Sequence, residues 1–519
     1  MLWFALHLSV LPLEALLAAL PTATQADGGE PARCVVEQRR VLLADDRASA
    51  AGVQPGMSAA SAASLLPGLQ SLPRDTAREA AFVERLALAL ARYTPAVVIE
   101  TDGVLLEAMA SLRLFGGARA LAQALRATVR ASGVQQAHMA LAPTARAASL
   151  LARVALDKPL PRRCAARGAG AATDPVAAWH QHTRERLDAL PLAAALAAWQ
   201  LPQRTAELLH GIGCRSLADV RALPRAGLQR RGGGALLEHL AQAYGEAPDP
   251  RPWFAPPPGF ELGLELLHRA DDAAMLVFAA ERLVQPLAGW LAQQWLAASR
   301  IALHLRHETS RHQALPDTVV RIGLGEASRD AKQIGLLLRE RLQRTELPAP
   351  VYALTLRLEE AVSHAGREAA LWRDPERGDA GDGDNRRGLI DRLGARLGPE
   401  RVQRLHLQAD HRPERAMATA PANAAASDAA GIEWPSPTPP RPTWLLPEPL
   451  RLPEHAGRPL HGGPLALRSR AERIEAGWFD GELISRDYHV AVGRDHRLRW
   501  VFRERCGDAA QWYLHGLFG

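Results

Sequence analysis

Hydrophobic and polar residues follow two different periods along the first 180 positions of the chain. Ala- and Leu-rich stretches with apolar residues at helical spacing predict helices at 78–92, 118–131 and 144–155. Short apolar runs predict strands at the start of the chain and at 138–142, and we expect a small helical insert before residue 73. Strands and helices that alternate in this way are typical of a mixed α/β domain.

The stretch 97–107 contains the most informative strand pattern. Val97 to Thr101 is rich in β-branched residues, Asp102-Gly103 is a turn-type pair, and Val104 restarts the apolar run. We therefore predict a hairpin. Taken alone, it fits an ordinary edge hairpin without any chemistry.

Residues 179–247 are predicted to be entirely helical, with short turns. A helix ends near His210, a Gly-x-Gly turn follows, and Ser216 is placed to cap the next helix. This predicts a helix-hairpin-helix, whose backbone N–H groups are suited to gripping a phosphate without reading bases. A plain corner between two helices is the alternative. Arginines at 215, 221, 225, 230 and 231 face only Asp219, so we expect a basic rim. The candidate DNA-binding residues are Gly211, Gly213, Arg215, Arg225, Arg230 and Arg231.

Prolines make 248–258 an extended linker. Beyond it the pattern predicts helices at 272–298 and 328–344 and strands at 300–306, 318–322 and 351–359. Acidic and basic residues nearly balance in this region, so we expect any grip on DNA here to be modest.

The chain changes character after residue 361. Residues 375–387 are rich in Gly, Asp and Arg and are expected to be disordered, 389–407 has helical periodicity, and 416–442 reads as a linker. Alternating runs at 487–492 and 498–503 predict a hairpin in an aromatic-rich end. Its aromatic side chains are candidates for a small core, for a docking face, or for both. The candidate partner-binding residues are Trp478, Phe479, Tyr488, Trp500, Trp512 and Tyr513.

Composition and charge are those of an ordinary globular protein and do not identify a function. The 519 residues are 47% hydrophobic and 23% charged, and a formal charge of +6 is compatible with nucleic acid without proving it. The four cysteines, at 34, 164, 214 and 506, fit no zinc spacing and predict reduced thiols in a cytoplasmic protein. The apolar start lacks a basic n-region, so we expect neither a signal peptide nor a membrane span.

Residues 100–107, Glu-Thr-Asp-Gly-Val-Leu-Leu-Glu, resemble the palm motif SIDEAYLD of Y-family translesion DNA polymerases, and Leu114-Phe115-Gly116 resembles the LFG that follows it. On this pattern the first carboxylate is kept as Asp102, and the adjacent glutamate is Gly103. The hairpin therefore resembles an active-site hairpin that has lost part of its chemistry.

The opening strand resembles the family's HIDMDAFFASVE. His7 matches, whereas Ser9 stands at the metal-binding aspartate and Leu11 at the second one. Two-metal phosphoryl transfer needs carboxylates, because Mg²⁺ is a hard cation. The resemblance thus implies an inactive site with no metal, no cofactor and no catalytic residue, in which Ser9, Asp102 and Gly103 are the degenerate positions.

The nucleotide contacts of the family are also altered. In its YEAR-like segment, Asp46 replaces the tyrosine and Ser49 the arginine, and an aspartate repels a triphosphate. Lys158-Pro159 resembles the family's triphosphate-binding pair, with an ordinary surface lysine as the alternative. The resemblance keeps the fold signature and loses the ligand set.

The resemblance implies an α/β multidomain chain that ends in a small β-rich module. The expected parts are a palm at 1–178 with a fingers insert at about 21–73, a thumb at 179–247, a linker at 248–259, a little finger at 260–361 with four strands and two helices, a linker with a short helix at 362–443, and a partner-binding module at 444–519.

A short peptide after the little finger resembles the sliding-clamp peptides of bacterial polymerases, QLxLF or QLPLW. It spans Glu368-Ala369-Ala370-Leu371-Trp372, where Leu371 and Trp372 fit the apolar pocket and Glu368 replaces the preferred glutamine. An incidental Leu-Trp pair in a loop is the alternative.

The tail from residue 473 resembles that of the non-catalytic members of bacterial damage-induced mutagenesis complexes. This implies an adaptor that joins DNA, the β sliding clamp, a RecA-like partner and an error-prone C-family polymerase at lesions. Two alternatives stay open. One is an active, divergent polymerase that uses Glu100 or Glu107, and the other is a DNA-binding protein that acts alone through the helix-hairpin-helix.

Overall fold

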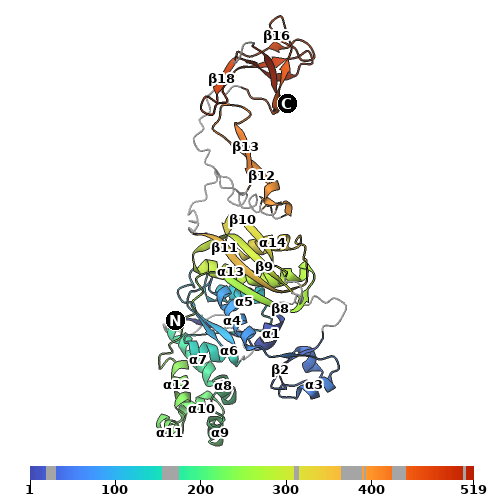
Figure 1. Ribbon diagram of the computed structural model, residues 1–519. Helices are drawn as coiled ribbons and strands as arrows, with labels where there is room; N and C mark the ends of the chain where they lie inside the picture. Colours follow the sequence, from blue (N-terminus) through green and yellow to red (C-terminus); the bar gives the residue numbers. More distant parts are fainter. Residues whose placement is uncertain are drawn as a thin grey trace. The chain divides into compact units, whose positions relative to one another are not determined.

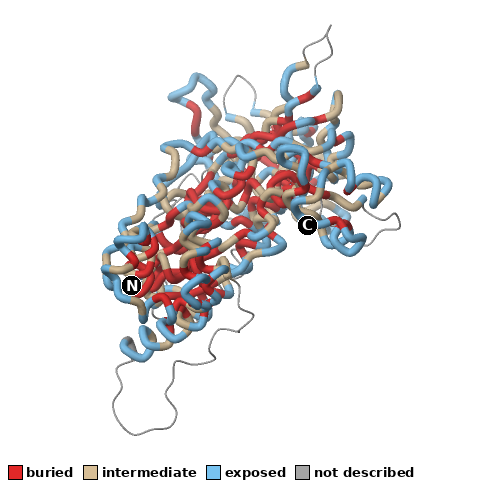
Figure 2. The backbone as a smooth tube through the Cα atoms, turned by 90° about the horizontal axis from the view of Figure 1, so that it is seen from below, coloured by how far each residue is buried: buried red, intermediate tan, exposed pale blue. Residues whose placement is uncertain are grey.

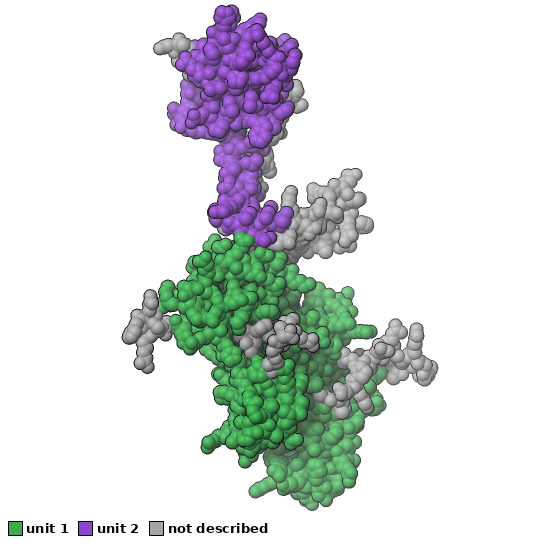
Figure 3. All heavy atoms as spheres, turned by 90° about the vertical axis from the view of Figure 1, so that its right-hand side faces the viewer, with its two compact units in different colours: residues 1–384 green, residues 385–519 purple. Residues whose placement is uncertain are grey.

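The computed structural model divides into two compact units, 1–384 and 385–519 (Figure 3). It describes residues 1–18, 31–154, 175–308, 315–363, 389–390, 393–394, 396–422, 440–505 and 510–519. The first unit is mixed α/β and the second is rich in strands, which confirms the predicted fold class. Figure 2 marks the buried positions in red and the exposed positions in pale blue along the backbone.

The palm is an antiparallel sheet of order β5-β6-β1-β7. Its strands are β1 (Trp3–His7), β5 (Val97–Glu100), β6 (Gly103–Glu107) and β7 (His138–Ala142). Four helices pack around it: α1 (Leu11–Leu17), α4 (Thr76–Leu90), α5 (Ala118–Ala131) and α6 (Ala145–Arg153) (Figure 1). The predicted hairpin is confirmed, and its turn lies one residue earlier than expected, at Thr101-Asp102, because Glu100 pairs with Gly103.

We expected the fingers insert to be helical, but it contains both strands and helices. It contains β2 (Arg33–Glu37), β3 (Arg40–Ala44) and β4 (Gln70–Pro73), with α2 (Asp46–Ala50) and α3 (Ala59–Leu65). The prediction failed because β2 and β3 are short and meet at a turn whose residues, Gln38 and Arg39, have positive φ angles of 47° and 65° without being glycine.

Residues 175–243 are helical, as predicted. The helices are α7 (Pro175–Asp188), α8 (Leu192–Ala198), α9 (Gln203–Gly211), α10 (Leu217–Ala222), α11 (Arg225–Arg230) and α12 (Gly234–Ala243). Ser216 caps α10 as expected, and Asp219 completes a capping box. Gly213, at φ +86°, takes the left-handed conformation that the turn between α9 and α10 requires.

The predicted four-stranded sheet with two helices follows the Pro-rich linker. It has the order β10-β9-β11-β8 and consists of β8 (Glu261–Ala270), β9 (Leu296–His307), β10 (Thr318–Ser328) and β11 (Val351–Ser363), with α13 (Ala273–Gln293) and α14 (Ala331–Leu342). The helix expected to reach residue 298 ends at 293, because β9 has begun by Leu296. Besides its own sheet and α14, α13 packs against α4 of the palm.

The second unit contains a hairpin and a larger sheet. The hairpin pairs β12 (Gln403–Leu407) with β13 (Met417–Pro421), so the helix expected at 389–407 and the linker expected at 416–442 are wrong at these residues. Burial alternates with a period of two along β12, which is the pattern of a strand. The larger sheet contains β14 (Trp444–Leu452), β17 (Ala466–Leu467), β18 (Glu472–Ala476), β19 (Ile484–Val492), β20 (Leu498–Glu504) and β21 (Trp512–Leu517). The predicted hairpin is β19–β20.

In the part of the chain that the structure describes, we find no helix with the length and apolar content needed to cross a membrane.

Candidate polymerase-like palm site

The hairpin turn between β5 and β6 brings the remaining palm carboxylates next to the end of β1. His7 pairs with Gly103 across β1 and β6, and the His7 Nδ1 atom lies 3.4 Å from Asp102 Oδ2. Burial lowers the pKa of His7 despite the opposing charge of Asp102. His7 is therefore a poor cation, and another group has to balance Asp102.

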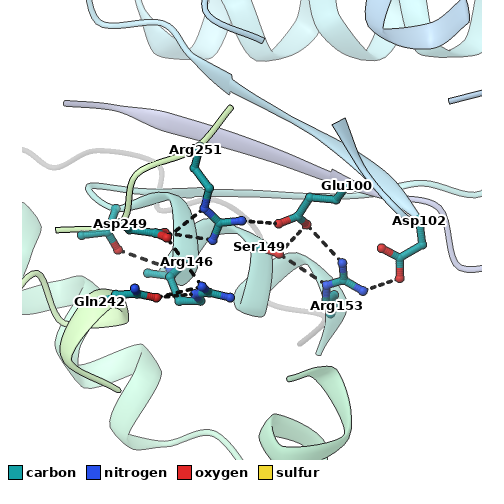
Figure 4. A network of polar contacts seen from close by, with 10 residues as sticks. Glu100, Asp102, Arg146, Ser149, Arg153, Gln242, Asp249 and Arg251 are labelled. Carbon is teal, nitrogen blue, oxygen red and sulfur yellow. Dashed lines mark hydrogen bonds and ion pairs between the residues drawn. The ribbon is translucent and has the colours of Figure 1, made fainter. Parts of the chain in front are cut away.

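Arg153, the last residue of α6, supplies that charge. Its guanidinium pairs with Asp102 and donates a second hydrogen bond, of 3.1 Å, to Glu100 Oε2 (Figure 4). Ser149, one helical turn earlier, donates a 2.6 Å hydrogen bond to the same Glu100 oxygen. Burial opposes the charge on Arg153, but Asp102 and Glu100 outweigh it and raise its pKa. One guanidinium thus bridges both carboxylates.

A second arginine reaches Glu100 from the linker after the thumb. Arg251 Nη1 lies 3.1 Å from Glu100 Oε1, and Arg251 Nη2 lies 2.9 Å from Asp249 Oδ2 (Figure 4). Arg146 of α6 donates to Gln242 of α12 and lies 3.6 Å from Asp249. A continuous polar network therefore joins palm, thumb and linker.

The structure leaves no space to restore the missing glutamate. A Cβ atom on Gly103 would lie 2.1 Å from the Leu6 carbonyl oxygen, so any side chain there requires the strands to shift. Ser9 is exposed on the turn after β1, and Leu11 is 2% exposed in the core. These residues do not fit a two-metal centre, and no group of three or more His, Cys, Asp or Glu among the described residues is placed to hold a metal ion.

Glu107, one of the two carboxylates that an active, divergent polymerase would use, lies at the other end of β6. It pairs with Trp3 rather than His7, and its Oε1 atom accepts hydrogen bonds of 3.2 Å from the backbone N–H groups of Leu2 and Met109. Asp46 and Ser49 of the fingers are both exposed, and Lys158-Pro159 lies outside the described residues.

In the thumb, the backbone N–H groups of the helix-hairpin-helix turn already have acceptors. Those of Ile212, Gly213 and Cys214 donate to carbonyls of α9. The next two, of Arg215 and Ser216, donate to Asp219 Oδ2 at 2.8 and 2.9 Å, and these bonds lower the pKa of Asp219. Binding a phosphate at these groups would require displacing a carboxylate.

The expected basic rim is partly neutralised. Arg221 pairs with Asp188 at 2.8 Å and lies 4.1 Å above the Tyr244 ring, and Arg225 pairs with Glu246. The expectation that these arginines face only Asp219 was therefore wrong, because the local sequence does not place Asp188, at the end of α7, and Glu246, after α12, near them.

The candidate partner-binding aromatics fall into two classes, except for Tyr513, which is half-buried. Tyr488, Trp500 and Trp512 are 1–3% exposed and belong to the core, so we correct their assignment to a docking face. Trp478 and Phe479 are 81% and 63% exposed. Tyr488, Trp500 and Trp512 are buried because strands β19, β20 and β21 place their rings inside the two apolar clusters of the sheet. The clamp-like peptide 368–372 lies outside the described residues.

Sequence reasoning missed Arg146, Ser149, Arg153 and Arg251. The spacing of Ser149 and Arg153 by four positions in a predicted helix was the one available signal. Nothing in the linker sequence points Arg251 at a palm carboxylate 151 positions earlier.

Sequence comparison finds relatives of this chain. A family model described as "impB/mucB/samB family" matches residues 22–153. "Protein ImuB" of Caulobacter vibrioides, in strain NA1000 / CB15N and in strain ATCC 19089 / CIP 103742 / CB 15, is 30% identical over 505 residues, which cover 90% of this chain and all of that protein.

Solved structures include "Insertion ternary complex of Dbh DNA polymerase" (18% identity, TM-score 0.37) and "Crystal Structure of DinB from Sulfolobus solfataricus" (16% identity, TM-score 0.35). Each alignment covers 70% of this chain and 99% of the other. The identity over the full length of the Caulobacter protein establishes the family: the chain belongs to the ImuB family.

Proposed function

We propose that this chain is a non-catalytic, polymerase-like adaptor in induced mutagenesis. Family membership makes it a Y-family polymerase-related protein of DNA damage tolerance. The proposal adds that the chain does not transfer nucleotides and that it joins DNA, the β sliding clamp, the RecA-like protein ImuA and an error-prone C-family polymerase. A cytoplasmic location stays a prediction from the cysteine pattern.

The proposed inactivity rests on one observation: arginine side chains pair with both palm carboxylates. Asp102 and Glu100 share Arg153, and Glu100 also accepts from Arg251 and Ser149. A catalytic Mg²⁺ would have to displace a guanidinium that is attached to the protein and is therefore always present at the site. Gly103 cannot supply a further ligand.

The active-polymerase alternative needs Glu100 or Glu107 to act as a replacement ligand. Glu100 already has three donors, and Glu107 accepts from two backbone N–H groups at the far end of β6. Neither carboxylate is available beside Asp102, so the geometry favours the adaptor.

Primer extension by the purified full chain with Mg²⁺ or Mn²⁺ tests the inactivity. We expect no extension by the wild type, and none by Arg153→Met, which removes the competing cation but adds no ligand. Extension that Asp102→Ala abolishes would refute the proposal. Extension that persists in Asp102→Ala would identify a contaminating polymerase.

The adaptor role is tested separately by a pull-down with the clamp, ImuA and the C-family polymerase as purified baits. We expect the full chain to be retained by all three, and a chain ending near residue 361 to lose them. Equal retention of both chains would place the partner contacts in the polymerase-like part instead.

A further inference from the structure

The turn between β18 and β19, residues 477–483, exposes three large apolar side chains. Trp478, Phe479 and Leu483 are 81%, 63% and 59% exposed, and the two rings contact each other edge to face at 5.8 Å. Other aromatics of the same module, such as Trp500 and Phe502, are 1% exposed. The module thus has its core without the turn, and the exposed rings contribute little to its stability.

A buried arginine holds this turn in one shape. The Arg412 side chain is 3% exposed and donates hydrogen bonds to Asp410 Oδ2 at 2.7 Å and to Asp480 Oδ2 at 2.6 Å. Its guanidinium carbon lies 5.7 Å from the centre of the Phe479 ring. The other oxygen of Asp480 accepts a 3.1 Å hydrogen bond from the Glu482 backbone N–H. A surface loop with no contacts to organise would have no need of such anchoring.

Gly477 adds a steric constraint on the same turn. Its φ is +84°, and a Cβ atom there would lie 2.0 Å from the Glu482 carbonyl oxygen, so the two sides of the turn are in contact. Arg415 pairs with Asp480 and Glu482 from outside. Because the rings are already held in place, a partner would not have to order them, which is the property of an interface anchor.

Charge decides what kind of partner fits. Exposed aromatic pairs can stack on nucleobases or enter a protein pocket. The turn itself carries the carboxylates of Asp480 and Glu482, and Glu475 lies just before it. The segment 410–415, which is tied to the turn, adds the carboxylates of Asp410 and Glu414 and the guanidiniums of Arg412 and Arg415. Acidic groups are in excess, and the most buried cation is Arg412, so phosphates are repelled.

We propose that the turn 477–483 is a docking tip that inserts Trp478 and Phe479 into an apolar pocket, rimmed by basic groups, on a partner protein. This inference rests on the proposed adaptor function, because the partner proteins of that function are the probes that test it. It deepens the function by assigning the contact to one turn of the β-rich module.

The test compares the full chain with Trp478→Ala/Phe479→Ala and with the control Trp444→Ala. Trp444 is 68% exposed in the same module but outside the turn. The affinity of each variant is measured for the purified clamp, ImuA and C-family polymerase and for a fluorescent single-stranded DNA. Aromatic anchors lose roughly thirtyfold or more in affinity on truncation. We expect that loss for one of the proteins with the tip variant, no loss with Trp444→Ala, and unchanged DNA binding.

Each other outcome overturns a different statement. Partner proteins that bind the wild type and the tip variant equally well would refute the docking tip and leave the adaptor function intact. A wild type that binds none of the three would refute the adaptor function itself. DNA affinity or self-association lost only in the tip variant would show that the occupant is nucleic acid or a second copy of the chain, and would refute the choice of a partner protein.

Discussion

Gly289 of α13 passes so close to Leu88 of α4 that a Cβ atom on Gly289 would lie 1.9 Å from the Leu88 carbonyl oxygen. The two helices belong to different parts of the polymerase-like unit, the four-stranded sheet after the linker and the palm. Their backbones are therefore in direct contact, without side chains between them. Such a contact makes the two parts one packed body rather than a palm with a loosely tethered arm.

Gly289→Ala is expected to destabilise the chain. The added methyl group meets a backbone carbonyl that cannot rotate away, and overpacking of this kind costs about 1–3 kcal/mol. Gly335→Ala in α14 is the matched control, since nothing lies within 4 Å of its Cβ position. Alanine there is expected to be neutral or to stabilise by about 0.5–1 kcal/mol. Urea unfolding of the two variants measures both effects, and equal midpoints would contradict the close contact.

DNA binding by the thumb is expected to depend on Arg230 and Arg231, because neither has an acidic partner among the residues that the structure describes. Arg230→Ala/Arg231→Ala should weaken binding to duplex DNA and lower the log–log salt slope by about 0.9 for each lost phosphate contact. Arg221→Ala, which removes the same kind of charge, should change the slope less, because Arg221 is held by Asp188 and Tyr244. Fluorescence anisotropy at several salt concentrations gives the slopes. A larger effect of Arg221→Ala would indicate that DNA binds instead to the surface beside α7.

Asp219→Asn should strengthen the same interaction. The amide oxygen can still accept from the N–H groups of Arg215 and Ser216, while the negative charge that faces an incoming phosphate is lost. Affinity for duplex DNA at fixed salt is the measurement. Unchanged affinity would mean that phosphates do not approach this turn.

The next prediction concerns the clamp-like peptide 368–372 and rests on its sequence alone. Leu371→Ala/Trp372→Ala should lower clamp affinity roughly thirtyfold or more, since a Leu-aromatic pair is the anchor of such peptides. Glu368→Gln should strengthen binding if residue 368 takes the amide position. Trp295→Ala, at another exposed tryptophan, serves as the control. Equal clamp affinity in all variants would show that the clamp is held elsewhere.

The C-terminal module should lose stability as the pH falls from about 6.5 to about 4. Burial lowers the pKa of His515 to about 4, and this fully buried ring hydrogen-bonds to the Tyr488 hydroxyl at 2.8 Å. Over this pH range the unfolded chain therefore binds a proton at His515 that the folded chain does not bind. The free energy of unfolding falls by about 1.4 kcal/mol for each unit by which the two pKa values differ. His515→Gln should flatten the pH dependence of unfolding between pH 7 and pH 5, whereas the exposed His455→Gln should not. Parallel curves for the wild type and His515→Gln would contradict a buried neutral imidazole.

The elements with strong periodicity were predictable from the sequence. Helix 118–131 and strand 138–142 have the predicted bounds, because each is a long or clean run of apolar residues at one spacing. The strands of the fingers and residues 403–407 were missed. Their local pattern is weak, so that pairing with a partner strand decides their structure.

Some residues of the palm site could likewise be predicted from the sequence, and others could not. Ser9 and Gly103 could be found from the motif, because the family pattern fixes what each position should hold. Arg251 could not, since a salt bridge across 151 positions leaves no local signal. For Arg153, whose partner Asp102 lies 51 positions earlier, the spacing of four positions from Ser149 was the one local signal. The aromatic side chains of the tail show a further limit: composition marks them as important, and only the sheet separates buried Trp500 from exposed Trp478.

The bridge from Arg153 to Asp102 and Glu100 also changes what the palm requires from its surroundings. A polymerase of this fold balances its carboxylates with dissolved metal ions and is incomplete without them. In this chain the counter-ion is covalently part of α6, so it cannot diffuse away, and a metal ion would have to displace it. The charge balance of the palm therefore does not require a supply of magnesium ions or of nucleotide, because α6 itself provides the positive charge.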